Sequence, residues 1–480
     1  MRFSSKIRGI VKVSSANLVA LSLSMLTSFL LPIFVSVEQY GYWQLFVMYT
    51  GYTGFFMLGF NDGVHLNYAT FDYDEKLAAK FKSFKLFLFI LTTIESVALI
   101  VILLVLSNGR DVLFYILLLC IANILPQSIC GLFTYMNQAT MRFTEYARGN
   151  IVDKVVFMIL MLLMLFLGVK NAIYYILVYT FSRYLTIGYH WYSSRLVFSV
   201  KRESFVVLKP EIKNNFKKGF PLMIANILGG SIVVGSRFFV QAKLGIEEFS
   251  SYSFSLHTIV IASQFIGAIA TVFYPIMKRA DSNNLRKLYN SFDKIATIAS
   301  AILLMSYFVI VIAVKVIYSK YIGILTYLFL VYPLFVFTCK ANILITNFYK
   351  VKNRPSALII VNSLAIVLHL SFVFIAYHCF GTIKSIACSV LLSYSLWYYL
   401  CQILIYHKEH WRLKLSVFYD VLLVICFLVV VHLSLNISIN IYRSTIIGLV
   451  IFFVVCSIVY LFFKKKINAS IREFMFLLKD

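Results

Sequence analysis

Long apolar runs, separated by short polar and basic stretches, follow one another along almost the whole chain. A helix that crosses a bilayer needs about 20 mostly apolar residues, and fourteen runs satisfy this requirement. They begin near Val13, Gly41, Phe84, Val112, Ile151, Ala172, Phe220, Ser250, Phe292, Tyr321, Ala357, Ser385, Ser416 and Tyr442. The pattern therefore predicts an all-α polytopic membrane protein with about 14 transmembrane helices.

The composition agrees with a membrane protein. Of the 480 residues, 61% are hydrophobic and 13% are charged, and the mean hydropathy is +0.87. Soluble proteins are about 45–50% apolar and about 25% charged, so lipid is the solvent for most of this surface. The formal net charge of +25 does not indicate a nucleic-acid partner, because the basic residues lie in short segments between apolar runs.

The distribution of Lys and Arg predicts the orientation in the membrane. With fourteen spans both termini lie on one side, and the segments on that side contain 34 of the 44 basic residues, against 7 in the short opposite loops. Both termini are therefore expected in the cytoplasm. The first apolar run is longer than that of a signal peptide, and no clear cleavage site follows it, so we interpret it as a retained first helix.

Two pairs of similar segments indicate an internal repeat. Ser36–Trp43 (SVEQYGYW) resembles Gly245–Tyr252 (GIEEFSSY), and Met141–Val152 (MRFTEYARGNIV) resembles Val351–Asn362 (VKNRPSALIIVN). The pairs are offset by 209 and 210 residues and occupy equivalent places among the spans. We therefore predict a duplicated six-helix unit whose two copies enter the membrane in the same direction. Transporters built on such parallel repeats bind substrate at the interface between the repeats.

The repeat divides the chain into four parts. We predict an N-lobe over 1–192, a basic cytoplasmic linker over 193–218, a C-lobe over 219–406, and helices 13 and 14 with a cytoplasmic tail over 407–480. An amphipathic helix on the membrane surface is the alternative for the linker. We favour a linker with surface contact.

Three cations and one acid lie well inside the predicted spans. The cations are Arg183, Arg237 and Lys340, and the acid is Glu95. Each charge at mid-membrane costs about 2.5–3.5 kcal/mol on insertion scales, so these residues are expected to face the bundle interior or a water-filled cavity. The excess of positive charge favours an anionic ligand such as a pyrophosphate group. Two structural alternatives stay open: Lys340 extends to the cytoplasmic surface, or Arg183 pairs with Glu95.

Uncharged polar residues mark further candidates in the spans. Pro126, beside Gln127, should kink span four and free a backbone carbonyl that a neighbour or water must satisfy. Asn226 and Gln264 are candidates for lining a cavity, and hydrogen bonds or packing between helices are the alternative for both.

The stretch Met57–Ala69 (MLGFNDGVHLNYA) is expected to be the cytoplasmic end of span two. In a helix, Asn61, Asp62 and His65 share a face, because His65 follows the other two by four and three residues. A hairpin at Asp62-Gly63 is excluded, since the bilayer does not accept an open strand edge. Two ligands without a third do not make a metal site. These residues either cap the helix end at the interface or line the inner gate of a cavity.

Three segments carry a resemblance to a known family. They are Val37–Ala69, Gly235–Phe254 and the basic step Tyr349–Ser356. With the fourteen-span layout, they make the chain similar to the multidrug/oligosaccharidyl-lipid/polysaccharide (MOP) exporter superfamily. It most closely resembles the polysaccharide-transporter branch of O-antigen and capsule repeat-unit flippases (Wzx type). One departure is Ser236-Arg237, where many relatives have Asp-Arg. Arg237 therefore either meets an anion or is paired from another helix.

The resemblance implies two parallel six-helix lobes around a central cavity, with two further C-terminal helices. It also implies a flippase that moves an undecaprenyl-pyrophosphate-linked oligosaccharide from the inner to the outer leaflet of the bacterial inner membrane by alternating access. This substrate, an O-antigen or capsule repeat unit, would belong to polysaccharide and lipopolysaccharide biosynthesis. Arg237, Arg183 and Lys340 would bind it.

The resemblance and the residues also set expectations about partners. We expect a monomer among membrane lipids, near the glycan polymerase machinery and without cofactor or metal. A proton, a sodium ion and the membrane potential all stay open as the energy source.

Other functions are weighed against this expectation. A small-molecule antiporter of the drug-extrusion branch should carry a buried acidic site for cationic drugs, which the excess of cations disfavours. A membrane-embedded glycan polymerase or ligase should carry a large outward loop with catalytic residues, which the sequence lacks. There is no P-loop and no recurring catalytic set, so we expect a transporter and not an enzyme. An accessory scaffold is the last alternative, and the charges inside the spans argue against it.

Overall fold

The computed structural model describes residues 19–69, 71–107, 109–259, 277, 281–352, 355–411, 419–437 and 440–477. The regular structure in these ranges is helical. Nine helices in these ranges are long and apolar enough to cross a membrane, whereas the expected total of about 14 spans stays a prediction. Contacts divide the chain into two units, Met1–Ile227 and Leu228–Asp480, which are described separately below.

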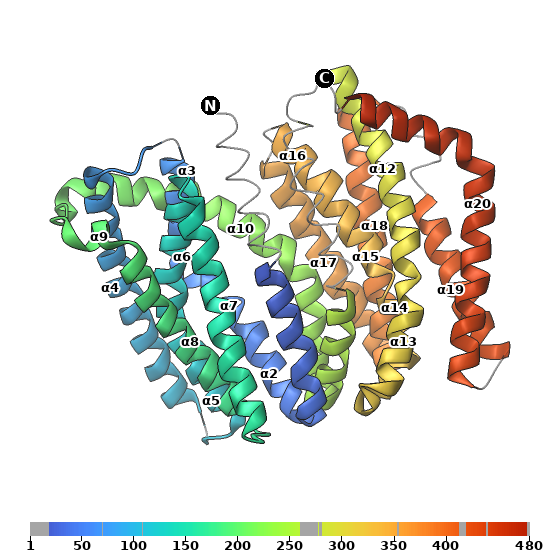
Figure 1. The fold of residues 1–480 in the computed structure, drawn as a ribbon, viewed down its shortest axis with the longest axis horizontal. Coiled ribbons are helices and arrows are strands. Elements are labelled where there is room, and N and C mark those ends of the chain that lie inside the picture. Colours follow the sequence, from blue (N-terminus) through green and yellow to red (C-terminus); the bar gives the residue numbers. More distant parts are fainter. Residues whose placement is uncertain are drawn as a thin grey trace. The chain divides into compact units, whose positions relative to one another are not determined.

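Unit 1 is a bundle whose helices follow one another through short connections (Figure 1). Four side chains cap helices of this unit, because Ser36, Asp74, Asp111 and Asn171 each accept a hydrogen bond from a backbone N–H of the first turn. Its helices are Val19–Phe34, α2 (Val37–Thr50), the 3-10 helix η1 (Thr53–Met57), α3 (Phe60–Tyr68), α4 (Glu75–Leu106), α5 (Val112–Ala122), α6 (Ile124–Ala139), α7 (Phe143–Phe166), α8 (Ala172–Ser193), α9 (Arg195–Ser199) and the first part of α10 (Phe205–Leu244).

Span two, expected as one helix from Gly41, is interrupted in the structure. The chain leaves α2 at Thr50, passes through η1, and turns at Leu58 and Gly59, both left-handed with φ of 47° and 76°. Only glycine fits easily at Gly59, because a Cβ there would also lie 2.5 Å from the backbone of Gly219 on α10. The break lets α3 begin at Phe60, and its glycines permit close contact with α10.

The kink expected at Pro126 is present as a break between two helices. Asn123 ends α5 and precedes α6, which places Pro126 in the first turn of α6. A proline has no N–H for the carbonyl four residues earlier, here that of Ala122. The hydroxyl of Tyr184 on α8 donates a hydrogen bond of 2.9 Å to this carbonyl. The predicted freed carbonyl, satisfied by a neighbour, is confirmed.

The segment expected as a linker, 193–218, is largely helical. It contains α9 and the first turns of α10, which runs as one helix from Phe205 into the following span. The reason is an apolar stripe at four-residue spacing: Leu208 is fully buried, and Ile212 and Phe216 pack on the same apolar core of unit 1. The basic composition concealed this stripe.

Unit 2 contains the rest of α10 and the helices that follow it (Figure 1). Within it α17 packs along α18, and α19 along α20. The tenth predicted span is a series of short helices with a π-helical turn, and it is mostly buried. The helices are α12 (Ser282–Leu304), α13 (Ser306–Val316), η2 (Ser319–Thr326), α14 (Leu328–Val331), α15 (Leu334–Lys340), the π-helical η3 (Ala341–Thr346), α16 (Asn347–Val351), α17 (Pro355–Phe380), α18 (Ile383–Lys408), α19 (Tyr419–Ile437) and α20 (Ile441–Leu477).

The contact between α3 and α10 gives a first prediction. A Cβ on Gly63 would lie 1.9 Å from the backbone oxygen of Asn215, so Gly63→Ala must push two helix backbones apart. Overpacking costs about 1–3 kcal/mol, and we expect the upper part of that range. The measurement is the thermal unfolding midpoint in detergent micelles. Gly54→Ala is the matched control, because a Cβ there meets nothing within 4 Å. Equal midpoints for the two variants would contradict the close approach.

Candidate functional site

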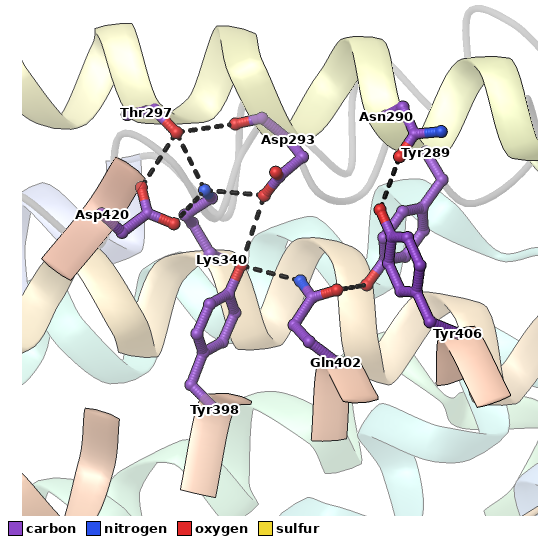
Figure 2. A network of polar contacts seen from close by, with 9 residues as sticks. All are labelled: Tyr289, Asn290, Asp293, Thr297, Lys340, Tyr398, Gln402, Tyr406 and Asp420. Atoms are coloured by element: carbon purple, nitrogen blue, oxygen red, sulfur yellow. Dashed lines mark hydrogen bonds and ion pairs between the residues drawn. The ribbon is translucent and has the colours of Figure 1, made fainter. Parts of the chain in front are cut away.

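In unit 2, a buried lysine is held by two aspartates (Figure 2). The Nζ atom of Lys340 lies 2.6 Å from Asp293 Oδ1, 2.5 Å from Asp420 Oδ2 and 2.9 Å from the hydroxyl of Thr297. The Thr297 hydroxyl is in turn 2.9 Å from Asp420 Oδ1. We call Lys340, Asp293, Asp420 and Thr297 the lysine cluster.

Three separate helices position the lysine cluster. Asp293 and Thr297 stand one turn apart on α12, so both face the same neighbour. Lys340 is the last residue of α15, directly before the π-helical turn η3, and Asp420 lies in the first turn of α19. The side chains of Lys340 and Asp420 are 1% exposed, and that of Asp293 is 8% exposed. The cluster thus joins α12, α15 and α19 through buried charges.

A chain of hydrogen bonds extends from the lysine cluster along α18 (Figure 2). The hydroxyl of Tyr398 donates to Asp293 Oδ1 at 3.3 Å, and the amide nitrogen of Gln402 donates to the Tyr398 hydroxyl at 2.8 Å. The hydroxyl of Tyr289, back on α12, donates to the Gln402 amide oxygen at 2.8 Å. These bonds hold Asp293 in one orientation and tie α12 to α18.

Unit 1 holds a second buried charge pair, on α7 and α8. Arg183 Nη1 lies 3.0 Å from Asp153 Oδ1, and Lys154 Nζ lies 3.1 Å from Asp153 Oδ2. The guanidinium also donates at 3.0 Å to the hydroxyl of Tyr179, one turn earlier on α8. We call Arg183, Asp153 and Lys154 the arginine cluster. It joins α7 to α8 with two cations around one acid, the reverse of the lysine cluster.

The structure corrects the count of charges inside the spans. Glu95 was expected as the one acid there, but Asp153, Asp293 and Asp420 are all buried beside a cation. Arg183 therefore pairs with Asp153 and not with Glu95, and Lys340 is buried and does not extend to the surface. A signal was present in the sequence, because each of the three aspartates stands within the first few residues of an apolar run. An acid at the start of an apolar run is also typical of a polar helix end, so the sequence alone does not identify these aspartates as buried partners.

Arg237 and Glu95, the two other charged candidates, lie outside the lysine cluster and the arginine cluster. Arg237 is half-buried in the unit 2 part of α10, where its Nε donates to the Ser253 hydroxyl at 3.2 Å and its guanidinium lies 5.4 Å from the centre of the Phe249 ring. Glu95 is on α4 of unit 1, and its Oε2 is buried with no hydrogen-bond partner in the described ranges. Asn226 is exposed on α10.

The residues at the end of span two gather against α6. Asn61 is buried, and its amide donates to the Ser128 carbonyl at 3.1 Å. Asp62 accepts a hydrogen bond of 3.4 Å from Tyr135, whose ring lies 5.6 Å from that of His65. The three residues thus face one helix, as their spacing predicts.

Two other candidates complete the set. Gln127 is half-buried on α6, and Gln264 lies outside the described residues. Within the described ranges, no group of three or more His, Cys, Asp or Glu side chains is arranged to hold a metal ion.

Comparison with protein families assigns the chain to a known group. Residues 7–281 match the family described as polysaccharide biosynthesis protein. The chain belongs to the polysaccharide biosynthesis protein family. A comparison with curated proteins gives no significant match. The family agrees with the polysaccharide branch indicated by the sequence.

Solved structures show the fold of this polysaccharide biosynthesis protein. It is similar to the lipid II flippase MurJ in an inward closed conformation, with a TM-score of 0.68 and 11% identity over 95% of this chain and 100% of the other. A MOP superfamily transporter from Pyrococcus furiosus matches with a TM-score of 0.59, 11% identity, and coverage of 84% and 95%. An outward-facing MATE family multidrug resistance transporter matches with a TM-score of 0.57 and 13% identity, over 84% of this chain and 95% of the other. The fold is that of the MOP transporters, and the protein is a multi-pass membrane protein.

The lysine cluster gives a second prediction. Lys340→Met leaves the carboxylates of Asp293 and Asp420 buried without a cation, and breaking a buried pair in this way costs about 3–5 kcal/mol. We expect the unfolding midpoint in detergent at neutral pH to fall steeply. The triple variant Asp293→Asn/Lys340→Met/Asp420→Asn carries no buried charge and should recover most of the loss. A single variant as stable as the unmodified chain would show that the cluster is not a stabilising contact.

Proposed function

We propose that the protein is a flippase for a lipid-linked oligosaccharide of polysaccharide biosynthesis. In this proposal, an undecaprenyl-pyrophosphate-linked O-antigen or capsule repeat unit moves from the inner to the outer leaflet of the bacterial inner membrane by alternating access. Family membership carries the proposal, because a membrane-embedded member of a polysaccharide biosynthesis family with a transporter fold has a glycan carried on a lipid as its natural cargo. A protein similar in fold, MurJ, is a lipid II flippase.

Arg237 is the residue we assign to the anionic head group. Arg183 and Lys340 already form ion pairs with carboxylates, so these two cations link helices of the protein. Arg237 is half-buried, and it contacts the Ser253 hydroxyl and the Phe249 ring among other groups. A guanidinium presents a planar fork of donors that fits two phosphate oxygens at once. We therefore propose Arg237 as the first of the three candidate cations to test for pyrophosphate contact.

Exchange of the flipped lipid in vesicles tests this assignment. Purified protein is reconstituted with a fluorescent polyprenyl-pyrophosphate oligosaccharide, and the fraction open to a membrane-impermeant glycosidase is followed over time. We expect Arg237→Ala to slow exchange by about tenfold or more, because a bidentate charged contact is worth about 1.5–3 kcal/mol. Arg237→Lys should retain part of the rate, since a point charge replaces the fork.

The control lies on the same helix. Lys243 is exposed near the end of α10, so Lys243→Ala removes one positive charge without touching Arg237 and should leave exchange unchanged. An Arg237→Ala variant that folds normally and exchanges the lipid at the unmodified rate would remove Arg237 from the site. No exchange above empty vesicles with the unmodified protein would contradict the flippase itself.

A further inference from the structure

The segment 191–207, which contains α9 and is called the α9 segment below, packs against the start of α4 (Figure 1). Two side chains of α4 hold it there. Lys82 Nζ donates to two backbone carbonyl oxygens of the segment at 2.9 and 2.8 Å, and the hydroxyl of Ser83 donates to a third at 2.7 Å. The α9 segment therefore has a fixed position along α4.

This position is the boundary between the polar start of α4 and its apolar part. The third predicted span begins at Phe84, directly after Lys82 and Ser83. Two turns further along the same face of α4, Phe89 and Ile90 are 48% and 46% exposed. An exposed apolar face within a span is in contact with lipid. The α9 segment thus lies over the lipid-facing side of α4, at the level of the membrane interface.

Exposed apolar and aromatic side chains on the α9 segment fit that interface. Val206 and Val207, in the first turn of α10, are 83% and 59% exposed. Trp191 and Tyr192, at the end of α8, are 61% and 67% exposed. Trp and Tyr favour the head-group level of a bilayer, and apolar side chains of a surface helix enter the boundary between head groups and acyl chains. Contact with lipid removes this apolar surface from water.

The exposed charge of the α9 segment, and of the turns of α10 that follow it, is positive. Residues 195–218 contain seven Lys or Arg and two Glu, and all seven basic side chains are exposed. Both acids are directed toward the protein, because Glu203 Oε2 is buried and Glu211 forms an ion pair of 2.5 Å with Lys80. The surface therefore complements a negatively charged partner.

Three of these cations are held in place beside the exposed aromatic side chains. The guanidinium of Arg195 lies 4.5 Å from the centre of the Tyr192 ring. Lys201 and Arg202 stand between two residues whose backbone carbonyls bond to α4. A guanidinium presents a planar fork of donors to phosphate oxygens, and an ammonium group adds a point charge. The three cations thus suit phosphate groups at the interface.

We propose that the α9 segment binds acidic phospholipid head groups in the leaflet on the Lys- and Arg-rich side of the membrane. Arg195, Lys201 and Arg202 contact the phosphate oxygens, and the exposed apolar side chains lie at the boundary with the acyl chains. An acidic soluble protein would match the charge, but it would not account for apolar side chains beside the lipid-facing side of α4. The proposal does not depend on the flippase function.

Photo-crosslinking in vesicles tests the proposal on the full chain. The protein is reconstituted in phosphatidylcholine vesicles with a trace of phosphatidylglycerol or phosphatidylcholine that carries a photoreactive head group. Labelled chymotryptic peptides are then identified by mass spectrometry. We expect the phosphatidylglycerol probe to label the α9 segment about fivefold or more above the phosphatidylcholine probe. Unlabelled phosphatidylglycerol should compete, and high salt should reduce the difference.

The triple variant Arg195→Gln/Lys201→Gln/Arg202→Gln removes the proposed phosphate contacts. It should reduce labelling by the phosphatidylglycerol probe to the level of the phosphatidylcholine probe, and labelling by the latter should not change. Chymotrypsin does not cleave at Lys or Arg, so the variant and the unmodified chain give corresponding peptides.

The matched control is Arg110→Gln/Lys170→Gln/Lys243→Gln, which removes three exposed charges at the predicted opposite side of the membrane. It should keep the preference for phosphatidylglycerol. Equal labelling by both probes in the unmodified chain would overturn the proposal, and so would an equal loss of preference in the two triple variants. A segment that neither probe labels, but that a membrane-impermeant lysine reagent modifies, would overturn it in favour of a soluble partner.

Discussion

Buried charge within a hydrocarbon solvent is the constraint on which the structure of this protein depends. An ionised side chain inside the membrane is destabilising through the loss of its hydration unless it is paired with an opposite charge. Lys340 meets that demand by joining α12, α15 and α19, and Arg183 meets it by joining α7 to α8. These ion pairs link the helices within each unit.

The two clusters meet the constraint with opposite balances. Two cations surround Asp153, and two carboxylates surround Lys340. A cluster with an excess cation stays ionised and serves as a fixed contact. In the lysine cluster the two acids share one cation, and the shared lysine links three helices where Asp153 links two.

Features set by local chemistry could be predicted from the sequence. The apolar runs predict the helices, and Pro126 predicts both a break and an orphaned carbonyl, which Tyr184 satisfies. Features set by contacts between distant segments could not. The left-handed Gly59 depends on Gly219, more than a hundred residues away, and the helical start of α10 depends on a core that only exists once α3, α4 and α6 have packed.

The candidate site also contains residues that the sequence identifies and partners that only the fold identifies. Arg183, Arg237 and Lys340 could be found because a cation inside an apolar run is conspicuous, but the partners of Arg183 and Lys340 could not. Asp153, Asp293 and Asp420 each stand near a predicted helix end, where an acid is ordinary. Three-dimensional packing alone decides that the last two share one lysine. The sequence therefore indicates which charges need partners, and the fold decides which partners they have.

The sidedness of the lipid-linked glycan tests the central claim most directly. The protein is depleted in its own cells, and the lipid-linked repeat unit is then labelled by a reagent that reaches only the outer leaflet. A flippase predicts that the repeat unit accumulates unlabelled in the inner leaflet and that labelling returns when the protein is restored. Accumulation of unpolymerised, labelled units in the outer leaflet would contradict the account, because transport would then have occurred without the protein.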